Sequence, residues 1–133
     1  RKESSAASDV YKRQAHARAK SVERKATSAG VSTDSFDPAT LQDPTEAALL
    51  SALADYPRVV AQAAQLREPH RVARYLESLA GLFHKWYDAC RVTPLGDDPA
   101  EPVHASRLML DQATATVLSN GLDLMGVSAP ERM

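Results

Sequence analysis

The chain has 133 residues with 44% apolar content, which suits one domain built around one core. Its single cysteine, Cys90, excludes an internal disulfide, and its formal charge of −1 argues against a domain that holds nucleic acid by overall charge alone. No apolar run approaches the roughly 20 residues of a membrane span and no signal peptide is visible, so we expect a cytoplasmic protein without membrane contacts.

The composition predicts an all-α fold, because Ala and Leu are abundant and Val and Ile do not alternate as they do in strands. We expect a helical bundle of about five helices. The first fourteen residues fit this pattern poorly. They are Ser-rich and polar, and residues 4–14 resemble the peptide obtained when a sequencing-library adapter is translated. We therefore expect residues 1–14 to be a non-native or disordered segment and residues 15–133 to form the domain.

The first expected helix starts at Ala15 and ends near Gly30, where a helix cap belongs. Residues 30–44 are rich in turn formers and predict a surface loop. Asp43 and Pro44, with Glu46 in reach of a capping box, predict the start of the next helix. We expect Pro57 to end or restart that helix.

The most regular apolar stripe follows Pro69 and ends at Trp86, which we therefore place in the core. A last helix is expected over residues 103–119, with Asn120 and Gly121 stopping it. The apolar segment 122–127 should fold back onto the bundle and so fix the position of Met133.

No enzymatic or metal site is predicted. The four histidines (His16, His70, His84 and His104) are isolated in sequence, none pairs with Cys90 at a zinc-ligand spacing, and no Gly-rich phosphate loop is present. We expect no catalytic residue, no metal ligand and no cofactor bound by this chain. Cys90 lacks a neighbouring base and is interpreted as a small buried apolar residue.

Charge is unevenly distributed. Half of the 16 basic residues lie within the first 25 positions, and a second group decorates the helix that carries Trp86. Two interpretations stay open on charge alone: a basic binding face on a neutral protein, or ordinary solvated helix faces.

Three segments resemble the anticodon-binding domain of arginyl-tRNA synthetases. The chain ends in Pro-Glu-Arg-Met after an apolar run, as members of that family do. Upstream, EPHRVARYL at 68–76 leads into LAGLFHKWYD at 79–88, and AHAR at 15–18 resembles the end of the family pattern Tyr-x-x-Tyr-Ala-His-x-Arg. The resemblance covers residues 15–133 and implies an all-α anticodon-binding domain of the type called DALR.

The resemblance also implies a tRNA anticodon-binding site made of Arg18, Tyr87 and Met133. Arg18 matches the arginine of the family pattern, while Gln14 and Tyr11 stand where the family has its two tyrosines. Tyr87 matches a tyrosine at the anticodon-loop surface, and Met133 matches the terminal methionine that reaches the same pocket. From the residues alone, Tyr87 could equally be a tyrosine that covers the rim of the core.

The implied function is anticodon-loop recognition in an arginine–tRNA ligase, with tRNA-Arg and the catalytic domain of the same synthetase as partners. ATP and Mg²⁺ are implied for that catalytic domain, whose class I motifs are not in this sequence, so we expect a fragment that is catalytically inactive and monomeric. The alternative is a free-standing helical protein–protein interaction module, which the amphipathic helices would also suit. Salt dependence separates the two, because phosphate contacts weaken with salt and apolar packing does not.

Overall fold

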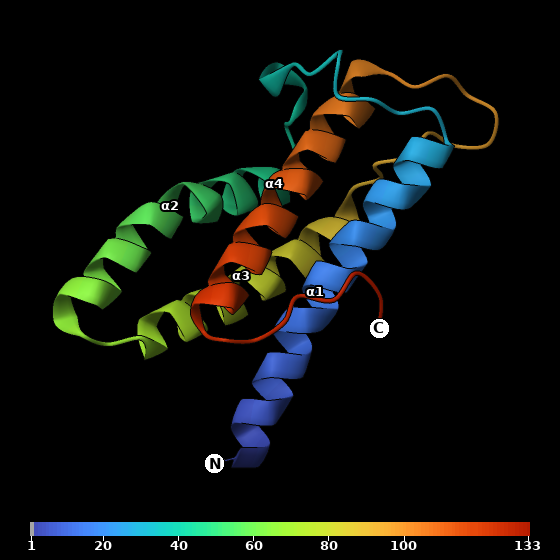
Figure 1. Cartoon of the computed structure of the whole chain (residues 1–133). Coiled ribbons are helices and arrows are strands. Elements are labelled where there is room, and N and C mark those ends of the chain that lie inside the picture. The colour runs from blue at the N-terminus through green and yellow to red at the C-terminus, as the bar shows by residue number, and fades with distance from the viewer. Residues whose placement is uncertain (1) are drawn as a thin grey trace.

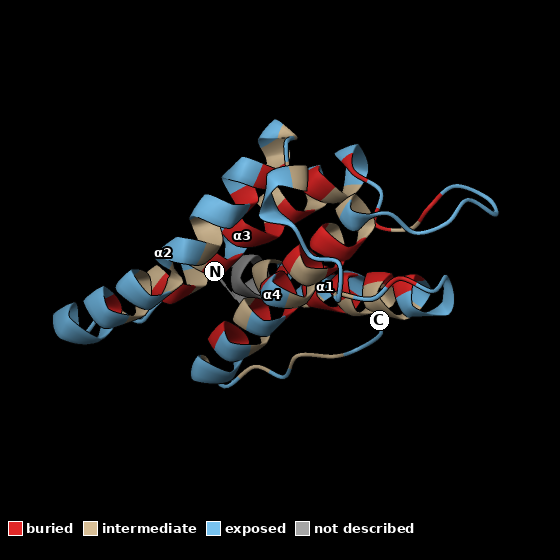
Figure 2. Cartoon of the chain, turned by 90° about the horizontal axis from the view of Figure 1, so that it is seen from above, coloured by how far each residue is buried: buried red, intermediate tan, exposed pale blue. Residues whose placement is uncertain are grey.

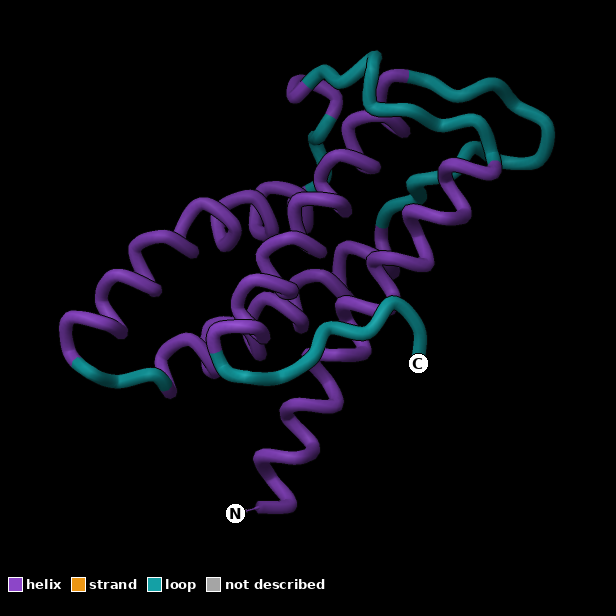
Figure 3. The backbone as a smooth tube through the Cα atoms, in the orientation of Figure 1, coloured by secondary structure: helices purple, strands orange, loops and turns teal. Residues whose placement is uncertain are grey.

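A computed structural model describes residues 2–133, with side chains described from Ala7 onwards. Four α-helices run in order: α1 (Lys2–Ser28), α2 (Pro44–Leu66), α3 (His70–Ala89) and α4 (Pro102–Leu124), with a short 3₁₀ turn, η1 (Pro38–Thr40), before α2 (Figure 1). No strand occurs between residues 2 and 133, and the rest of that stretch is loop (Figure 3). The all-α prediction is confirmed, but there are four α-helices where about five were expected.

The core lies where α1, α3 and α4 pack together, and α2 packs mainly along α3. Figure 2 shows α2 as mostly exposed or intermediate, whereas buried residues recur along α3 and α4. The predicted stripe of α3 is buried as expected, with Leu76, Phe83 and Trp86 fully inaccessible. Trp86 is thus a core residue, as the sequence indicated.

The helix count is lower than predicted because α2 continues through Pro57. A proline inside a helix removes one backbone hydrogen bond and crowds the carbonyl four residues earlier. Pro57 lies on the exposed side of α2, where water can satisfy the carbonyl of Leu53. The Tyr75 hydroxyl also holds this part of α2 by donating to the Ala52 carbonyl at 2.6 Å. Packing on α3 therefore outweighs the local effect of the proline.

The predicted stop of the last helix at Asn120 and Gly121 is also wrong, because α4 continues to Leu124. Gly121 is buried inside α4, and a Cβ built there would lie 2.5 Å from Cδ2 of Leu76. This glycine is needed for the close approach of α4 to α3. The chain turns off after Leu124 through Gly126, whose φ is +72°, and the Val127 amide donates to the Leu122 carbonyl at 2.9 Å.

Two predicted helix boundaries are confirmed. Asp43 caps α2 through a capping box in which Glu46 reaches back to the Asp43 amide. At the end of α1, Gly30 has φ +82°, and the Val31 amide donates to the Ala26 carbonyl at 2.9 Å. Both features depend only on residues that are close together in sequence.

At its other end, α1 extends back to Lys2, so residues 2–14 are helical. Part of this stretch packs against the bundle. Lys12 is buried, and the Tyr11 ring lies 5.2 Å from the His84 ring, centroid to centroid. The suggestion that residues 1–14 are non-native stays a prediction.

The C-terminal segment folds back as predicted and crosses α1 (Figure 1). Val127 and Ala129 pack against the core. The Pro130 carbonyl lies 2.6 Å from Nδ1 of the buried His16, and Arg24 Nη1 donates to the Glu131 carbonyl at 3.2 Å. These contacts bring the end of the chain to the surface between α1 and α3.

Candidate functional site

Arg18 is the centre of the candidate site. It lies on α1 next to the buried positions Ala15 and Ala19, and so at the edge of the face that α1 turns to the bundle. Its guanidinium carbon lies 4.1 Å from the centroid of the Tyr87 ring, and its Nη1 lies 3.0 Å from Nδ1 of His84. One cation thus contacts an aromatic face and an imidazole at the same time.

The two partners of Arg18 come from one edge of α3. His84 and Tyr87 are three residues apart, so they are neighbours on the helix surface. They directly follow the buried Phe83 and Trp86, which places them beside the core stripe rather than on it. Tyr87 is half-buried and packs against the core as well as under Arg18. Tyr87 thus covers the rim of the core and also presents its ring to the guanidinium of Arg18.

Met133 shares a surface hollow with Arg18. The hollow has a volume of about 750 Å³ and is lined by Gln14, Ala17, Arg18, Ser21, Arg24, His84, Arg132 and Met133. Met133 stands at its margin with 64% of its surface exposed. Arg18, His84, Tyr87 and Met133 are called the Arg18 site below.

The lining of this hollow is cationic. Arg18 and Arg24 come from α1 and Arg132 from the C-terminal segment, and no Asp or Glu is among the lining residues. A concave surface that carries three guanidinium groups attracts phosphate and other anions, whatever the net charge of the whole chain. The distribution of charge therefore favours a basic binding face over scattered solvated charges.

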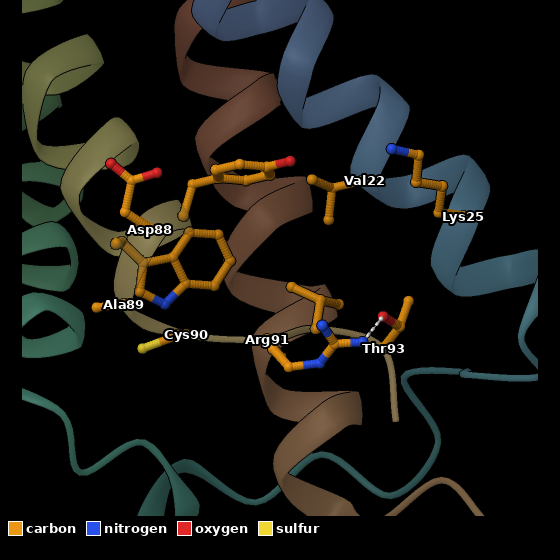
Figure 4. A pocket seen from close by; sticks show the side chains of 10 residues that line it. Val22, Lys25, Asp88, Ala89, Cys90, Arg91 and Thr93 are labelled. Atoms are coloured by element: carbon orange, nitrogen blue, oxygen red, sulfur yellow. Dashed lines mark hydrogen bonds between the residues drawn. The ribbon is translucent and has the colours of Figure 1, made fainter. Parts of the chain in front are cut away.

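Tyr87 does not line that hollow but a neighbouring one of about 450 Å³. Figure 4 shows this second hollow between Val22 and Lys25 of α1 and the segment that runs from the end of α3 to Thr93. Arg91 donates to the Thr93 hydroxyl there at 3.4 Å. The stacked pair of Arg18 and Tyr87 therefore stands between the two hollows and joins them.

Cys90 lies on the wall of the second hollow. It is a buried free cysteine, and burial raises the pKa of its thiol. A thiol with a raised pKa stays protonated and is a poor nucleophile at neutral pH. The predicted burial of Cys90 is confirmed.

A buried polar cluster supports α3 behind Tyr87. Trp86 donates its Nε1 proton to Oε2 of Glu46 at 3.0 Å, and Arg107 Nε donates to the same oxygen at 3.0 Å. Glu46 is fully buried, and the Asp43 amide donates to its other oxygen at 3.3 Å, so both carboxylate oxygens have donors. The sequence indicated Glu46 only as a capping residue. Its tertiary role could not be predicted because Arg107 lies 61 positions away.

His84 is the member of the Arg18 site that sequence reasoning missed. Isolated in sequence, it gave no metal or catalytic pattern. Its three-residue spacing from Tyr87 was the available signal, because it puts both side chains on the same edge of α3. Burial, followed by the nearby Arg18 charge, lowers the pKa of His84, which favours the neutral imidazole.

Within residues 2–133, no group of three or more His, Cys, Asp and Glu side chains is placed to hold a metal ion. No helix in the described part of the chain is both long and apolar enough to cross a bilayer.

Comparisons with known proteins agree with this architecture. The family model described as the DALR anticodon binding domain matches residues 13–133. An arginine–tRNA ligase of Clavibacter sepedonicus is 56% identical over 123 residues, which cover 92% of this chain and 22% of that protein. One of Kineococcus radiotolerans is 58% identical over 124 residues, with the same coverage.

Among solved structures, the arginyl-tRNA synthetase of Thermus thermophilus superposes with a TM-score of 0.75 at 38% identity. The match covers 92% of this chain and 21% of that one. The chain thus spans about a fifth of the length of the relatives that it matches.

Proposed function

Because the chain belongs to the DALR anticodon binding domain family, we propose that the Arg18 site holds the anticodon loop of a tRNA. The observation that carries the proposal is the stacked pair of Arg18 and Tyr87 between two hollows, one of them cationic. Single-stranded loops are recognised by unstacking bases onto aromatic or guanidinium planes while cations hold the phosphates. Each part of that mechanism has a candidate group here.

The roles of the individual residues follow from their positions. Arg18 supplies a guanidinium plane and hydrogen-bond donors, and Tyr87 gives it a rigid aromatic support. Arg24 and Arg132 line the hollow beside Arg18 and suit backbone phosphates. Met133 offers an exposed thioether side chain at the margin of the hollow, against which a base can pack.

The proposal can be tested by measuring how three variants of the chain bind an RNA hairpin that carries the anticodon loop of tRNA-Arg. Arg18→Ala, Tyr87→Ala and removal of Met133 should each weaken binding, and Tyr87→Ala should cost about 1–3 kcal/mol if a base stacks at this place. The matched control is Arg58→Ala, which removes an exposed arginine of α2 that pairs only with Asp55 at 3.6 Å. Full affinity in all three variants would show that the RNA binds elsewhere.

The relatives are arginine–tRNA ligases, so we propose that this domain supports arginylation of tRNA-Arg by a catalytic domain of the same enzyme. ATP and Mg²⁺ would serve that catalytic domain, which activates arginine before its transfer to tRNA. This chain matches only about a fifth of those proteins, and that fifth is the DALR domain. Nothing in the comparisons supports a free-standing protein interaction module.

The purified chain should therefore not exchange pyrophosphate into ATP in the presence of arginine, with or without tRNA-Arg. A radiolabelled exchange assay with a no-protein blank checks this prediction. Exchange above the blank would contradict the assignment of catalysis to another domain.

A further inference from the structure

The contact between Arg18 and His84 has only one consistent arrangement of protons. Every nitrogen of a guanidinium is a donor or has no free lone pair, and arginine stays protonated in proteins. Since Arg18 Nη1 lies 3.0 Å from His84 Nδ1, the arginine must donate and Nδ1 must accept. His84 is therefore the neutral tautomer with its proton on Nε2.

We propose that His84 is a positioning residue of the RNA site: its unprotonated Nδ1 holds the guanidinium of Arg18 flat against Tyr87, and protonation of His84 releases it. This inference rests on the proposed function, because the effect of orienting Arg18 is measured as a change in RNA affinity. The arginine has two anchors, the imidazole at 3.0 Å and the tyrosine ring at 4.1 Å, and α3 supplies both.

The position of the imidazole is fixed by its neighbours. The Phe83 ring lies 5.8 Å from the His84 ring and the Tyr11 ring 5.2 Å, both measured between centroids. His84 is half-buried between them. An acceptor held in this way can orient a long arginine side chain, which otherwise loses rotamer freedom when it binds RNA.

The charges around His84 oppose its protonation. Arg18 approaches from α1, and Arg24 and Arg132 line the same hollow from α1 and the C-terminal segment. Met133 also lines this hollow, and Asp88 lies one turn further along α3. Asp88 favours the charged imidazole, but burial and Arg18 act in the other direction and are the larger effects on the pKa of His84. Adding a proton at Nδ1 would leave two donors facing each other.

Two substitutions at His84 separate this role from its alternatives. His84→Asn keeps an acceptor at the position of Nδ1 and cannot be protonated in the physiological range. His84→Leu keeps bulk but has no acceptor. Both are compared with Arg18→Ala and with the double variant Arg18→Ala/His84→Leu, and the probe is the RNA hairpin with the anticodon loop of tRNA-Arg.

At pH 7.5 we expect His84→Asn to bind within about twofold of the unmodified chain, and His84→Leu to lose about tenfold, as expected for a hydrogen bond to a charged group. The double variant should bind no more weakly than Arg18→Ala alone, because His84 acts through Arg18. Lowering the pH to 5.5 should weaken binding by the unmodified chain more than binding by His84→Asn. If losses in the double variant add up, or if acidification strengthens binding only when His84 is present, His84 contacts RNA directly and the proposal is wrong.

A measurement without RNA tests the positioning of Arg18 by His84 even if the proposed function fails. Nitrogen-15 NMR of the imidazole of His84 should show a proton on Nε2 and none on Nδ1 at pH 7.5. In Arg18→Ala, the pKa of His84 should rise, because the nearby cation is gone. A proton on Nδ1, or a titration that Arg18→Ala leaves unchanged, would overturn the positioning role. If Arg18→Ala has full RNA affinity while the NMR result holds, only the proposed function has failed.

Discussion

Two carboxyl groups among the described residues are fully buried, and they differ in their hydrogen-bond partners. Glu46 accepts hydrogen bonds from Trp86 and Arg107. Asp111 on α4 is equally inaccessible, but neither of its carboxylate oxygens has a hydrogen-bond partner among the described residues. A buried carboxylate without donors is costly when ionised, so it takes up a proton instead. Burial, followed by the nearby Glu23, raises the pKa of Asp111 to about 8, although Lys20 acts in the opposite direction.

The sign of the resulting pH dependence follows from linkage. An unfolded Asp has a pKa of about 3.9 and is ionised at neutral pH, whereas the folded chain keeps Asp111 protonated up to a pKa of about 8. The folded state thus binds more protons between these values, and Asp111 makes folding less favourable as the pH rises through this window. Below about pH 4 the carboxyl is neutral in both states and its ionisation costs nothing, and above about pH 8 the cost of its ionisation no longer grows.

Asp111→Asn should remove this dependence, because an amide of nearly the same shape does not ionise. The difference in unfolding free energy between the variant and the unmodified chain should grow from pH 5 to pH 8, by at most about 1.4 kcal/mol per pH unit. Denaturant unfolding at several pH values measures it. A difference that is constant across this range would contradict the raised pKa of Asp111.

At the scale of the helices, short-range signals in the sequence were accurate only where no long-range contact overrode them. The cap of α2 at Asp43 and the end of α1 at Gly30 depend on residues within a few positions of each other, and both were predicted. The reason why residue 121 is a glycine depends on Leu76, which is 45 positions earlier. The Leu76 side chain occupies the space that a side chain at position 121 would need. Pro57 was misjudged for a related reason, because contacts with α3 stabilise α2 beyond its local preferences.

The glycines of α3 and α4 give a matched pair of substitutions. Gly121→Ala would place a methyl group 2.5 Å from Cδ2 of the fully buried Leu76, so it should destabilise the fold by about 1–3 kcal/mol despite the better helix propensity of Ala. At Gly81 in α3, a Cβ would meet only the Tyr11 hydroxyl at 3.6 Å. Gly81→Ala should therefore stabilise the chain by about 0.5–1 kcal/mol.

Thermal or urea unfolding of the two variants beside the unmodified chain provides the comparison. Equal stabilisation by both alanines would mean that Leu76 moves aside without cost and that the close approach of α3 and α4 does not require a glycine.

At the scale of the whole molecule, the Arg18 site combines residues from three segments that are far apart in sequence. Arg18 comes from α1, Tyr87 from α3 and Met133 from the end of the chain. The resemblance indicated these three residues, and their grouping follows from the way α1 packs on α3 and the last residues cross α1. Composition could not reveal this, because a net charge of −1 hides a hollow lined by three arginines. The part played by His84 became visible only from its distance to Arg18.

The most direct test of the central claim uses the unmodified chain and two RNA hairpins. One carries the anticodon loop of tRNA-Arg, and the other differs only in the central base of the anticodon. We expect tighter binding to the first hairpin and an affinity for both that falls as salt rises, because phosphate contacts release counterions. Equal affinity for the two hairpins, or binding that does not respond to salt, would contradict anticodon recognition by the Arg18 site.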